Sequence, residues 1–357
     1  MDLFGMLLLN PIVWVLVFAI ALVIVLKSAD LFVDNIVIIG KRLGISEIVL
    51  GVTAAAVGTS LPEFGSALMA TLGGSADLGV GVVVGANVWN IGGILAVTAI
   101  VTGIIKSDVK SITRDGLMAL ITGILLLVFI ILGFFIPGVY NMKIFWLGAI
   151  VMIIAYVFYM RILIKDSKAD SLENDEQVEN TQVGDDNNSN DDIVENDSLS
   201  NESKVESNSK SLLSGLLLVV ISIIGLGVGC KCLVWSVENF DHMFNVPQLI
   251  MGLFVLALFT TLPELFVTLS SAMKGLHDMS MGTVYGSCTF NILIGIGVPA
   301  LLLFNQGVPI ELISLYFDVP VMLGITLLSL LIIKLKGYQL TRNYGLFLLI
   351  LYIMYVV

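Results

Sequence analysis

Charged residues are scarce in this chain: they make up 13% of its 357 residues, whereas hydrophobic residues make up 57%. A soluble domain carries about 25% charged residues, so a large soluble core is excluded. Apolar runs of about 20 residues, the length that crosses a bilayer, recur along the chain. The composition therefore predicts a polytopic membrane protein embedded in the lipid bilayer, and no nucleic-acid partner is expected.

Cysteine and histidine are also rare. The three cysteines, Cys230, Cys232 and Cys288, fall in predicted spans. They indicate neither a disulfide framework nor a zinc site. The two histidines, His242 and His277, lie in or near predicted loops, and nothing marks them as catalytic.

The first apolar stretch lacks the basic flank of a signal peptide. Residues 1–10 contain Asp2 and no Lys or Arg, so we expect the first helix to be retained. It is long for a span, and its Lys27 and Asp30 are predicted to form a local i,i+3 ion pair. The hydropathy pattern predicts ten spans, at residues 8–40, 46–71, 78–104, 113–136, 144–165, 211–241, 247–273, 279–304, 312–333 and 343–357.

The net charge of −11 is concentrated in one segment between the fifth and sixth spans. Residues 166–210 hold 14 of the 28 acidic residues and almost no large apolar side chains. Such a segment cannot bury enough surface to offset its ordering entropy. We therefore predict an acidic disordered linker over residues 166–210.

The two halves of the chain repeat each other at a constant offset of 201 residues. Five spans in each half make the second copy enter the membrane upside down, which is the inverted-topology plan of many transporters. The predicted fold is an all-α integral membrane protein with two five-helix repeats, residues 1–165 and 211–357, joined by the linker. The identical pairs are Ala56/Ala257, Thr59/Thr260, Leu61/Leu262, Pro62/Pro263, Glu63/Glu264, Gly74/Gly275, Asp77/Asp278, Gly81/Gly282, Gly85/Gly286 and Asn90/Asn291.

Lysine and arginine gather on one side of this predicted topology. The loops after odd-numbered spans hold fourteen of them, and the opposite side holds only Lys143. The positive-inside rule places the fourteen, and with them the linker, in the cytoplasm. Both termini are then expected outside the cell membrane.

The repeated core places a carboxylate inside an apolar region, directly after a proline. Glu63 follows Pro62, and Glu264 follows Pro263. A charge at membrane depth costs roughly 2.5–3.5 kcal/mol on insertion scales, so its presence indicates function. A proline also breaks the helical hydrogen-bond ladder. We expect each of spans two and seven to be two half-helices around an unwound joint.

The residues around the two joints are rich in oxygen. Thr59, Ser60, Thr260 and Thr261 are residues of the helix-capping type, directly before the two breaks. Two glutamates, several hydroxyls and freed carbonyls suit a hard cation, since Ca2+ takes about 6–8 oxygen ligands. The duplication predicts one cation site built from two halves.

Spans three and eight carry further repeated residues. Glycines at positions 81, 85, 282 and 286 are interpreted as small-residue helix packing. Asn90 and Asn291 follow each glutamate by 27 residues, and both the cation-ligand and the packing interpretation stay open for them. Asp77 and Asp278 are predicted N-caps of these spans.

These motifs resemble a known family. GTSLPE at 58–63, TTLPE at 260–264 and GSCTFN at 286–291 are similar to the two alpha repeats of the sodium/calcium exchangers, in the calcium/cation antiporter superfamily. The resemblance implies antiport of Ca2+ against Na+ by alternating access, with spans one and six sliding past the other eight. It also implies a cation site that includes Ala56, Thr59, Ser60, Glu63, Asn90, Ala257, Thr260, Thr261, Glu264, Ser287 and Asn291.

Three positions depart from the family pattern. Ala86 stands where the family usually has Ser, Asn291 where many relatives have Asp, and Phe259 where Gly is expected. The first two remove a hydroxyl and a negative charge, so the Na+ sites and the stoichiometry are affected more than the fold.

Other functions stay open at the level of sequence. Two carboxylates can carry two protons, so Ca2+/H+ exchange is the close alternative, and a membrane cation sensor is a further one. We do not expect an enzyme, because no nucleophile and base occur together in the repeats. No cofactor is expected beyond the transported ions, Ca2+ and Na+ or H+, and the sequence indicates no protein partner.

Overall fold

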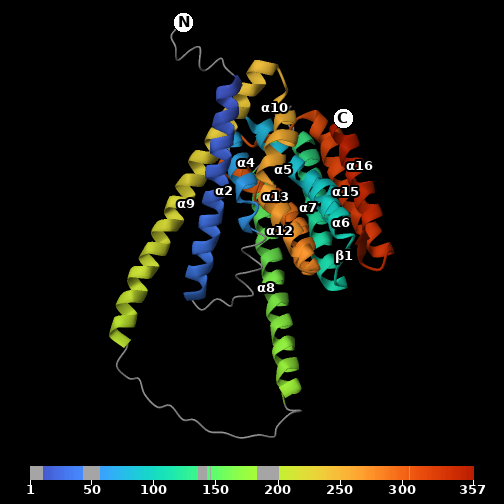
Figure 1. The fold of residues 1–357 in the computed structure, drawn as a ribbon. Helices are drawn as coiled ribbons and strands as arrows, with labels where there is room; N and C mark the ends of the chain where they lie inside the picture. The colour runs from blue at the N-terminus through green and yellow to red at the C-terminus, as the bar shows by residue number, and fades with distance from the viewer. Residues whose placement is uncertain (1–10, 43–56, 136–142, 145, 183–200, 305) are drawn as a thin grey trace.

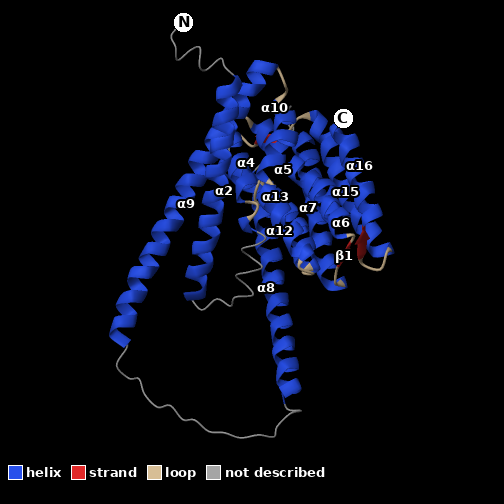
Figure 2. Cartoon of the chain, in the orientation of Figure 1, coloured by secondary structure: helices blue, strands red, loops and turns tan. Residues whose placement is uncertain are grey.

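The computed structural model describes residues 11–42, 57–135, 143–144, 146–182, 201–304 and 306–357. The described part is almost entirely helical, with two short two-stranded sheets (Figures 1 and 2). The start of α2 (Pro11–Arg42) and the end of α16 (Arg342–Val356) lie at one end of the molecule, and the end of α8 (Trp146–Gln182) and the start of α9 (Asn201–Phe244) lie at the other (Figure 1).

The first half of the chain contributes α2 (Pro11–Arg42), α4 (Leu61–Gly73), α5 (Ala76–Trp89), the π-helix η1 (Asn90–Leu95), α6 (Ala96–Thr102), β1 (Ile104–Lys106), α7 (Val109–Phe135), β2 (Lys143–Ile144) and α8 (Trp146–Gln182). The second half contributes α9 (Asn201–Phe244), α10 (Gln248–Ile250), the π-helix η2 (Met251–Leu256), α11 (Ala257–Thr260), α12 (Leu262–Met273), α13 (His277–Leu293), α14 (Gly297–Leu302), β3 (Val308–Pro309), the π-helix η3 (Ser314–Asp318), α15 (Val319–Leu335), β4 (Gln339–Thr341) and α16 (Arg342–Val356).

Seven of the described helical segments are long and apolar enough to cross a membrane, and a bent pair at Gln248–Thr260 and Leu262–Met273 makes an eighth. A shorter apolar helix, Arg342–Val356, follows. The predicted second span is described only from residue 57 onward. The count of ten spans therefore stays a prediction.

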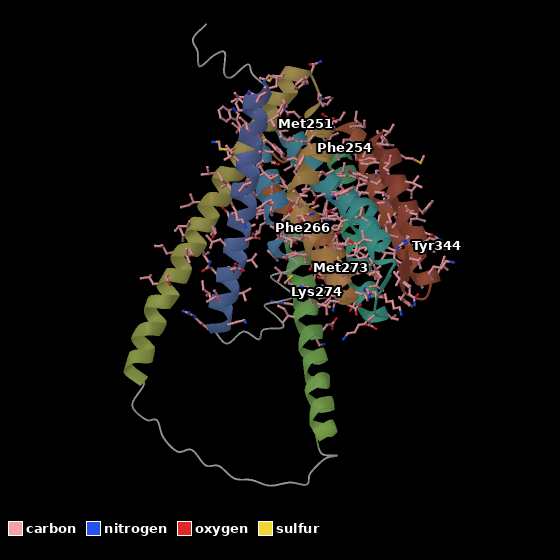
Figure 3. The ribbon with its side chains drawn as sticks, viewed as in Figure 1. Met251, Phe254, Phe266, Met273, Lys274 and Tyr344 are labelled. Atoms are coloured by element: carbon pink, nitrogen blue, oxygen red, sulfur yellow. The ribbon has the colours of Figure 1, made fainter. Side chains whose placement is uncertain are left out.

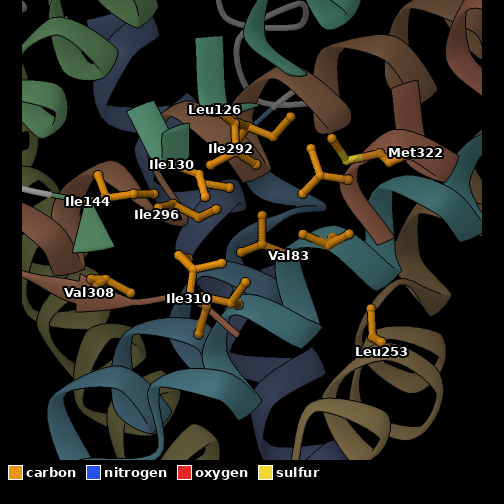
Figure 4. Close-up of a cluster of buried hydrophobic side chains, with 14 of the residues drawn as sticks. Val83, Leu126, Ile130, Ile144, Leu253, Ile292, Ile296, Val308, Ile310 and Met322 are labelled. Carbon is orange, nitrogen blue, oxygen red and sulfur yellow. The ribbon is translucent and has the colours of Figure 1, made fainter. Parts of the chain in front are cut away.

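The segments that carry the two repeated asparagines form the centre of the bundle. Within Ala76–Thr102, 89% of the most apolar window is buried, and within His277–Leu302, 83% is buried. The other five single spans are 28–39% buried. Apolar side chains from both halves fill the space around these central helices, including Val83, Leu126 and Ile292 (Figure 4).

The central helices approach their neighbours at glycines, as the sequence predicted. A Cβ atom on Gly81 would lie 2.6 Å from the carbonyl oxygen of Leu249, and one on Gly85 would lie 2.2 Å from that of Leu253. Both carbonyls belong to the chain at α10 and η2, so the backbones of α5 and this segment touch. The packing interpretation is confirmed at these two positions.

Each short sheet joins the two halves of the chain. β1 pairs antiparallel with β4, and β2 pairs antiparallel with β3. β1 and β3 occupy corresponding connections, since one follows α6 and the other follows α14. β2 and β4 likewise precede the corresponding helices α8 and α16.

Helices α2 and α9 pack against each other along one side of the bundle (Figure 1). They are the first helices of the two halves. On α2, the Nζ of Lys27 lies 3.8 Å from Oδ2 of Asp30, which confirms the predicted i,i+3 pair.

The ends of the acidic segment are helical, which differs from the prediction of disorder over residues 166–210. α8 continues to Gln182, and α9 begins at Asn201. Residues 183–200 lie outside the described residues. A helix already nucleated in an apolar span extends at little cost, and a guanidinium Nη1 of Arg114 pairs with Asp166 at 3.1 Å where α8 leaves the bundle.

The predicted N-caps Asp77 and Asp278 are wrong. The N-cap positions are Ser75 and Leu276, and the two aspartates lie in the first turns of α5 and α13. Oδ1 of Asp278 instead accepts hydrogen bonds from the Ser107 hydroxyl and the Asp108 amide, at 2.9 and 2.7 Å. A carboxylate in the first turn also complements the helix dipole.

Candidate cation site

The predicted helix break of span seven is confirmed and lies directly before Pro263, whereas span two is described only from residue 57 onward. α12 starts at Leu262 after a turn at Thr261, and the segments on either side of this break meet at 46°. In the first half, a turn at Thr59 and Ser60 precedes α4, which starts at Leu61. The proline occupies the first turn of each new helix, where its missing N–H has no intrahelical acceptor to lose.

The two breaks bring Glu63 and Glu264 together in the interior. Both side chains are fully buried, and their carboxyl groups are close enough to interact electrostatically. Neither carboxyl oxygen of Glu63 has a hydrogen-bond partner among the described residues, and Oε2 of Glu264 has none either. Like charges in a buried site oppose each other, so this pair requires a cation or protons.

One hydrogen bond connects the two joints. The hydroxyl of Ser60 donates to Oε1 of Glu264 at 2.9 Å. Ser60 occupies the N-cap position of α4 but makes no side-chain capping bond. Ser60, which has the sequence character of a helix cap, therefore bonds to the glutamate of the other half of the chain instead of capping its own helix.

The threonines of the second joint bond to their own helix. Thr260 donates to the Leu256 carbonyl at 2.9 Å, and Thr261 donates to the Ala257 carbonyl at 2.9 Å. Their hydroxyl oxygens keep acceptor capacity for a cation. The Ala257 carbonyl also accepts the Thr261 amide at 3.2 Å, so a cation at this carbonyl would share it with the helix.

The candidate asparagines lie on the two central segments, one in each half of the chain. Asn90, Ser287 and Asn291 are fully buried. Among the described residues, both amide atoms of Asn90, the Ser287 hydroxyl and Oδ1 of Asn291 have no hydrogen-bond partner. Ser287 also lies near Glu264, and Asn291 follows it by one turn on the same helix.

Regular helical geometry fails just after each asparagine. The π-helix η1 begins at Asn90. In the second half α13 ends at Leu293, and the Gly295 amide bonds to the Phe290 carbonyl at 3.3 Å, five residues back. π-type distortions are frequent at functional sites.

The structure places nine of the eleven candidate residues on the two joints, at the glutamate pair or on the stretch of α13 beside it. Asn90 lies next to Cys288, and Ala56 lies outside the described residues. The structure also adds a residue that the sequence interpretation missed. Asn87 is 1% exposed and contacts Asn291, with Nδ2 of Asn291 3.3 Å from Oδ1 of Asn87. A polar residue on a buried span, one turn before Asn90, was the available signal.

The family assignment follows from comparison with known proteins. A family described as "Sodium/calcium exchanger protein" matches residues 13–165 and 214–357, which is most of the chain. The chain belongs to the sodium/calcium exchanger family. The unmatched segment between the two ranges contains the acidic residues 166–210.

Relatives of this exchanger family align over nearly the whole chain. The sodium/calcium exchanger MaX1 of Methanosarcina acetivorans is 28% identical over 96% of this chain and 97% of its own. The inner membrane protein YrbG of Escherichia coli is 27% identical over 91% and 90%. A solved structure of the sodium-calcium exchanger NCX_Mj, soaked with 100 mM Na+ and 10 mM Sr2+, is 25% identical, with a TM-score of 0.58 and coverage of 97% and 98%.

A cavity beside α2 reaches one residue of the candidate site in this exchanger-family chain, Thr59. It has a volume of about 510 Å3 and lies between α2 and α12. Thr59 and Pro263 line it, and Lys27, Asp30 and Asp34 line it from α2. Charged side chains at the depth of a span require water or protein around them, and this cavity supplies the space.

Proposed function

We propose that this chain is a secondary active antiporter that exchanges Ca2+ for Na+ across a membrane by alternating access. One observation carries the proposal: Glu63 and Glu264, from equivalent positions of the two halves, form a buried carboxyl pair, and Ser60 of the first half donates a hydrogen bond to Glu264 of the second. A divalent cation neutralises this pair, and so do two monovalent cations. The same site can therefore hold either ion in turn.

The proposed ligands are oxygen atoms from both halves. They are the carboxylates of Glu63 and Glu264, joined by hydroxyl, amide and main-chain carbonyl oxygens. Together they supply the 6–8 oxygens that Ca2+ takes. The remaining proposed ligands are Ala56, Thr59, Ser60, Asn90, Ala257, Thr260, Thr261, Ser287 and Asn291.

Three features support an inverted repeat in this antiporter. Apart from the π-helices, the helices and strands from α4 to α8 follow the same order as those from α12 to α16, the prolines at the start of α4 and α12 are equivalent, and the strand pairs join corresponding connections. Lys41 and Arg42 close α2, Lys274 closes α12, and the end of α8 lies toward the same end of the molecule (Figures 1 and 3). The positive-inside rule makes that end cytoplasmic, with the acidic segment there and both termini outside.

Alternating access requires two groups of helices that move relative to each other. The α2–α9 pair is the proposed moving group, because its helices pack on each other at the side of the bundle. The cavity between α2 and α12 is the proposed cytoplasmic route to Thr59 and the glutamates. Phe266 lies on α12 along this route (Figure 3).

The deciding experiment uses the purified protein in proteoliposomes. We expect 45Ca2+ uptake that is driven by an outward Na+ gradient and is lost when choline replaces Na+. Uptake driven by a proton gradient, without Na+, would identify the Ca2+/H+ alternative. Binding of 45Ca2+ without flux under either gradient would contradict antiport and indicate a sensor.

A further inference from the structure

The two central helices meet at a pair of residues from equivalent positions. Asn87 and Cys288 are separated by the repeat offset of 201 residues, and both are buried. Nδ2 of Asn87 donates to the main-chain carbonyl of Cys288 at 3.1 Å, and Sγ of Cys288 lies 3.9 Å from the main-chain carbonyl of Asn87. Each side chain thus contacts the backbone of the other half.

Of the two side chains, Asn87 and Cys288, only that of Asn87 has a second polar atom that can form a hydrogen bond. Its Oδ1 accepts a hydrogen bond from Nδ2 of Asn291 at 3.3 Å. The amide of Asn87 therefore lies between one acceptor and one donor. Rotating it by 180° would place oxygen against oxygen and NH2 against NH2, so the pair of contacts fixes its orientation.

This fixed orientation also determines that of Asn291. Because Nδ2 of Asn291 is turned toward Asn87, its Oδ1 is the atom left without a partner, and that atom is buried. Ser287, one turn earlier on α13, has a buried hydroxyl that is also without a hydrogen-bond partner and lies near Glu264. Two oxygens on one helix face are thereby left available beside the glutamate.

The equivalent asparagine in the first half is not held in this way. Asn90 has the thiol of Cys288 as its neighbour, in the place where Asn291 has an amide. A thiol is a weak donor and a weak acceptor. Neither amide atom of Asn90 has a hydrogen-bond partner among the described residues.

We propose that Asn87 is a positioning residue that presents the Oδ1 atom of Asn291 to the cation. This inference rests on the proposed ion site and deepens it. The half-site on α13 is built before a cation arrives, whereas Asn90 reorients when one binds. Asn87 also sets specificity at position 291, because a carboxylate there would place its oxygen against Oδ1 of Asn87.

The test is a swap of the two equivalent residues in the full-length protein, with Na+-driven 45Ca2+ flux in proteoliposomes as the readout. Asn87→Cys gives the first half the side chain that the second half already has. We expect KM for Ca2+ to rise about 3- to 10-fold, the effect of losing one hydrogen bond, with a much smaller change in maximal rate. Cys288→Asn in the same protein supplies an amide next to Asn90 and is expected to return KM toward the wild-type value.

A double-mutant cycle separates positioning from a structural role. If Asn87 acts through Asn291, then Asn87→Cys adds nothing to the KM of Asn291→Ala. Thr98→Val removes a buried hydroxyl that bonds to the Ile94 carbonyl on the same central segment, and it is expected to leave KM unchanged. If Asn87→Cys does not insert, Asn87→Ser makes the same test, since Ser cannot bridge both partners.

The outcomes distinguish this inference from the proposed function. Wild-type KM and flux in Asn291→Ala would remove Asn291 from the ion site and overturn the positioning role, while the proposed exchange would stand. Absence of Na+-driven flux in the wild-type protein would overturn the proposed function. An impaired Asn291→Ala with a normal KM in Asn87→Cys, or additive effects in the cycle, would overturn the positioning role alone.

Discussion

The hydroxyl of Ser60, in the first half of the chain, donates a 2.9 Å hydrogen bond to the carboxylate of Glu264 in the second half. The bond makes each half of the candidate site depend on the other. It also makes the two glutamates inequivalent, because the carboxyl oxygens of Glu63 have no hydrogen-bond partner among the described residues.

Neutralising either glutamate is expected to abolish Ca2+ transport. Glu63→Gln or Glu264→Gln removes half of the fixed charge of the site, while loss of a buried charge does not harm insertion. The measurement is 45Ca2+ flux at matched expression. Asp318→Asn is the control, since Asp318 is a carboxylate only 3% exposed that accepts a hydrogen bond from Tyr355 outside the site. Wild-type flux in either glutamine variant would refute the site.

Ca2+ exchange is expected to survive deletion of about residues 183–200. These residues separate the helical ends of α8 and α9, and loop length has a small thermodynamic cost. The longer deletion of about residues 170–205 is expected to retain basal exchange as well. Basal flux is measured for each deletion, with insertion checked by size-exclusion chromatography. Complete loss of flux in a properly inserted deletion would make the segment part of the transport mechanism.

Exchange is expected to carry little or no current. Glu63 and Glu264 provide at most two negative charges, which one Ca2+ or two monovalent cations neutralise. A third Na+ would leave an uncompensated charge in a poorly solvated site, which is strongly penalised. Potential-sensitive dyes in proteoliposomes measure the current. About one net charge moved per Ca2+ would show that neutral oxygens or water stabilise an extra ion.

Asn291→Asp is expected to make the exchange more electrogenic, because it adds a third negative charge to the site. Asn87 opposes this change by presenting Oδ1 to position 291. The added current should therefore be larger when Asn87→Ser accompanies Asn291→Asp. The same dye measurement compares the single and double variants, and equal currents would contradict the effect of Asn87.

Gly85→Ala is expected to destabilise the protein by about 1–3 kcal/mol, a common cost of overpacking. The new Cβ atom would lie 2.2 Å from the carbonyl oxygen of Leu253, and a backbone atom cannot rotate away. Gly324→Ala is the matched control, because a Cβ atom there meets nothing within 4 Å. Thermal unfolding in detergent compares the two variants. Equal midpoints would show that α5 and η2 are not tightly packed.

Glu311→Gln is expected to stabilise the protein at neutral pH. Partial burial raises the pKa of Glu311, an exposed residue, above its usual 4.5, and the nearby Asp77 raises it further. The folded state therefore holds a proton that the unfolded state has lost, and stability falls as pH rises from the ordinary pKa through the raised one. Unfolding midpoints in detergent should differ between variant and wild type at pH 7 and converge below pH 4.5. A constant difference would contradict this origin.

The residues that define the candidate site could be predicted because they are repeated. Glu63 and Glu264, with their prolines and hydroxyls, recur at one offset, and an acid in an apolar region has few structural explanations. Asn87 was missed by the same reasoning, because its counterpart is Cys288 rather than another asparagine. A search for identical residues in the two halves finds only positions that both halves share. The contact of Asn87 with Asn291 has no equivalent in the repeat, because the position equivalent to Asn87 is Cys288.

Other features depend on interactions that a sequence pattern does not contain. Ser60 has the sequence character of a helix cap, and only the fold shows that Glu264 competes successfully for its hydroxyl. The π-helix that begins at Asn90 has no counterpart in the residue pattern from which it could be predicted. The polar composition of residues 166–182 indicated disorder, but a helix that starts in the apolar span continues through them.

The helix breaks also determine the electrostatic field in which the glutamates lie. α4 and α12 begin at the joints, and Glu63 and Glu264 lie in their first turns. A helix N-terminus is equivalent to about half a positive charge, so the two ends together offset on the order of one of the two negative charges. An empty site with both carboxylates ionised is therefore less unstable than its formal charge suggests. The same field weakens the attraction for a bound cation, so each ion can leave when the site opens on the other side.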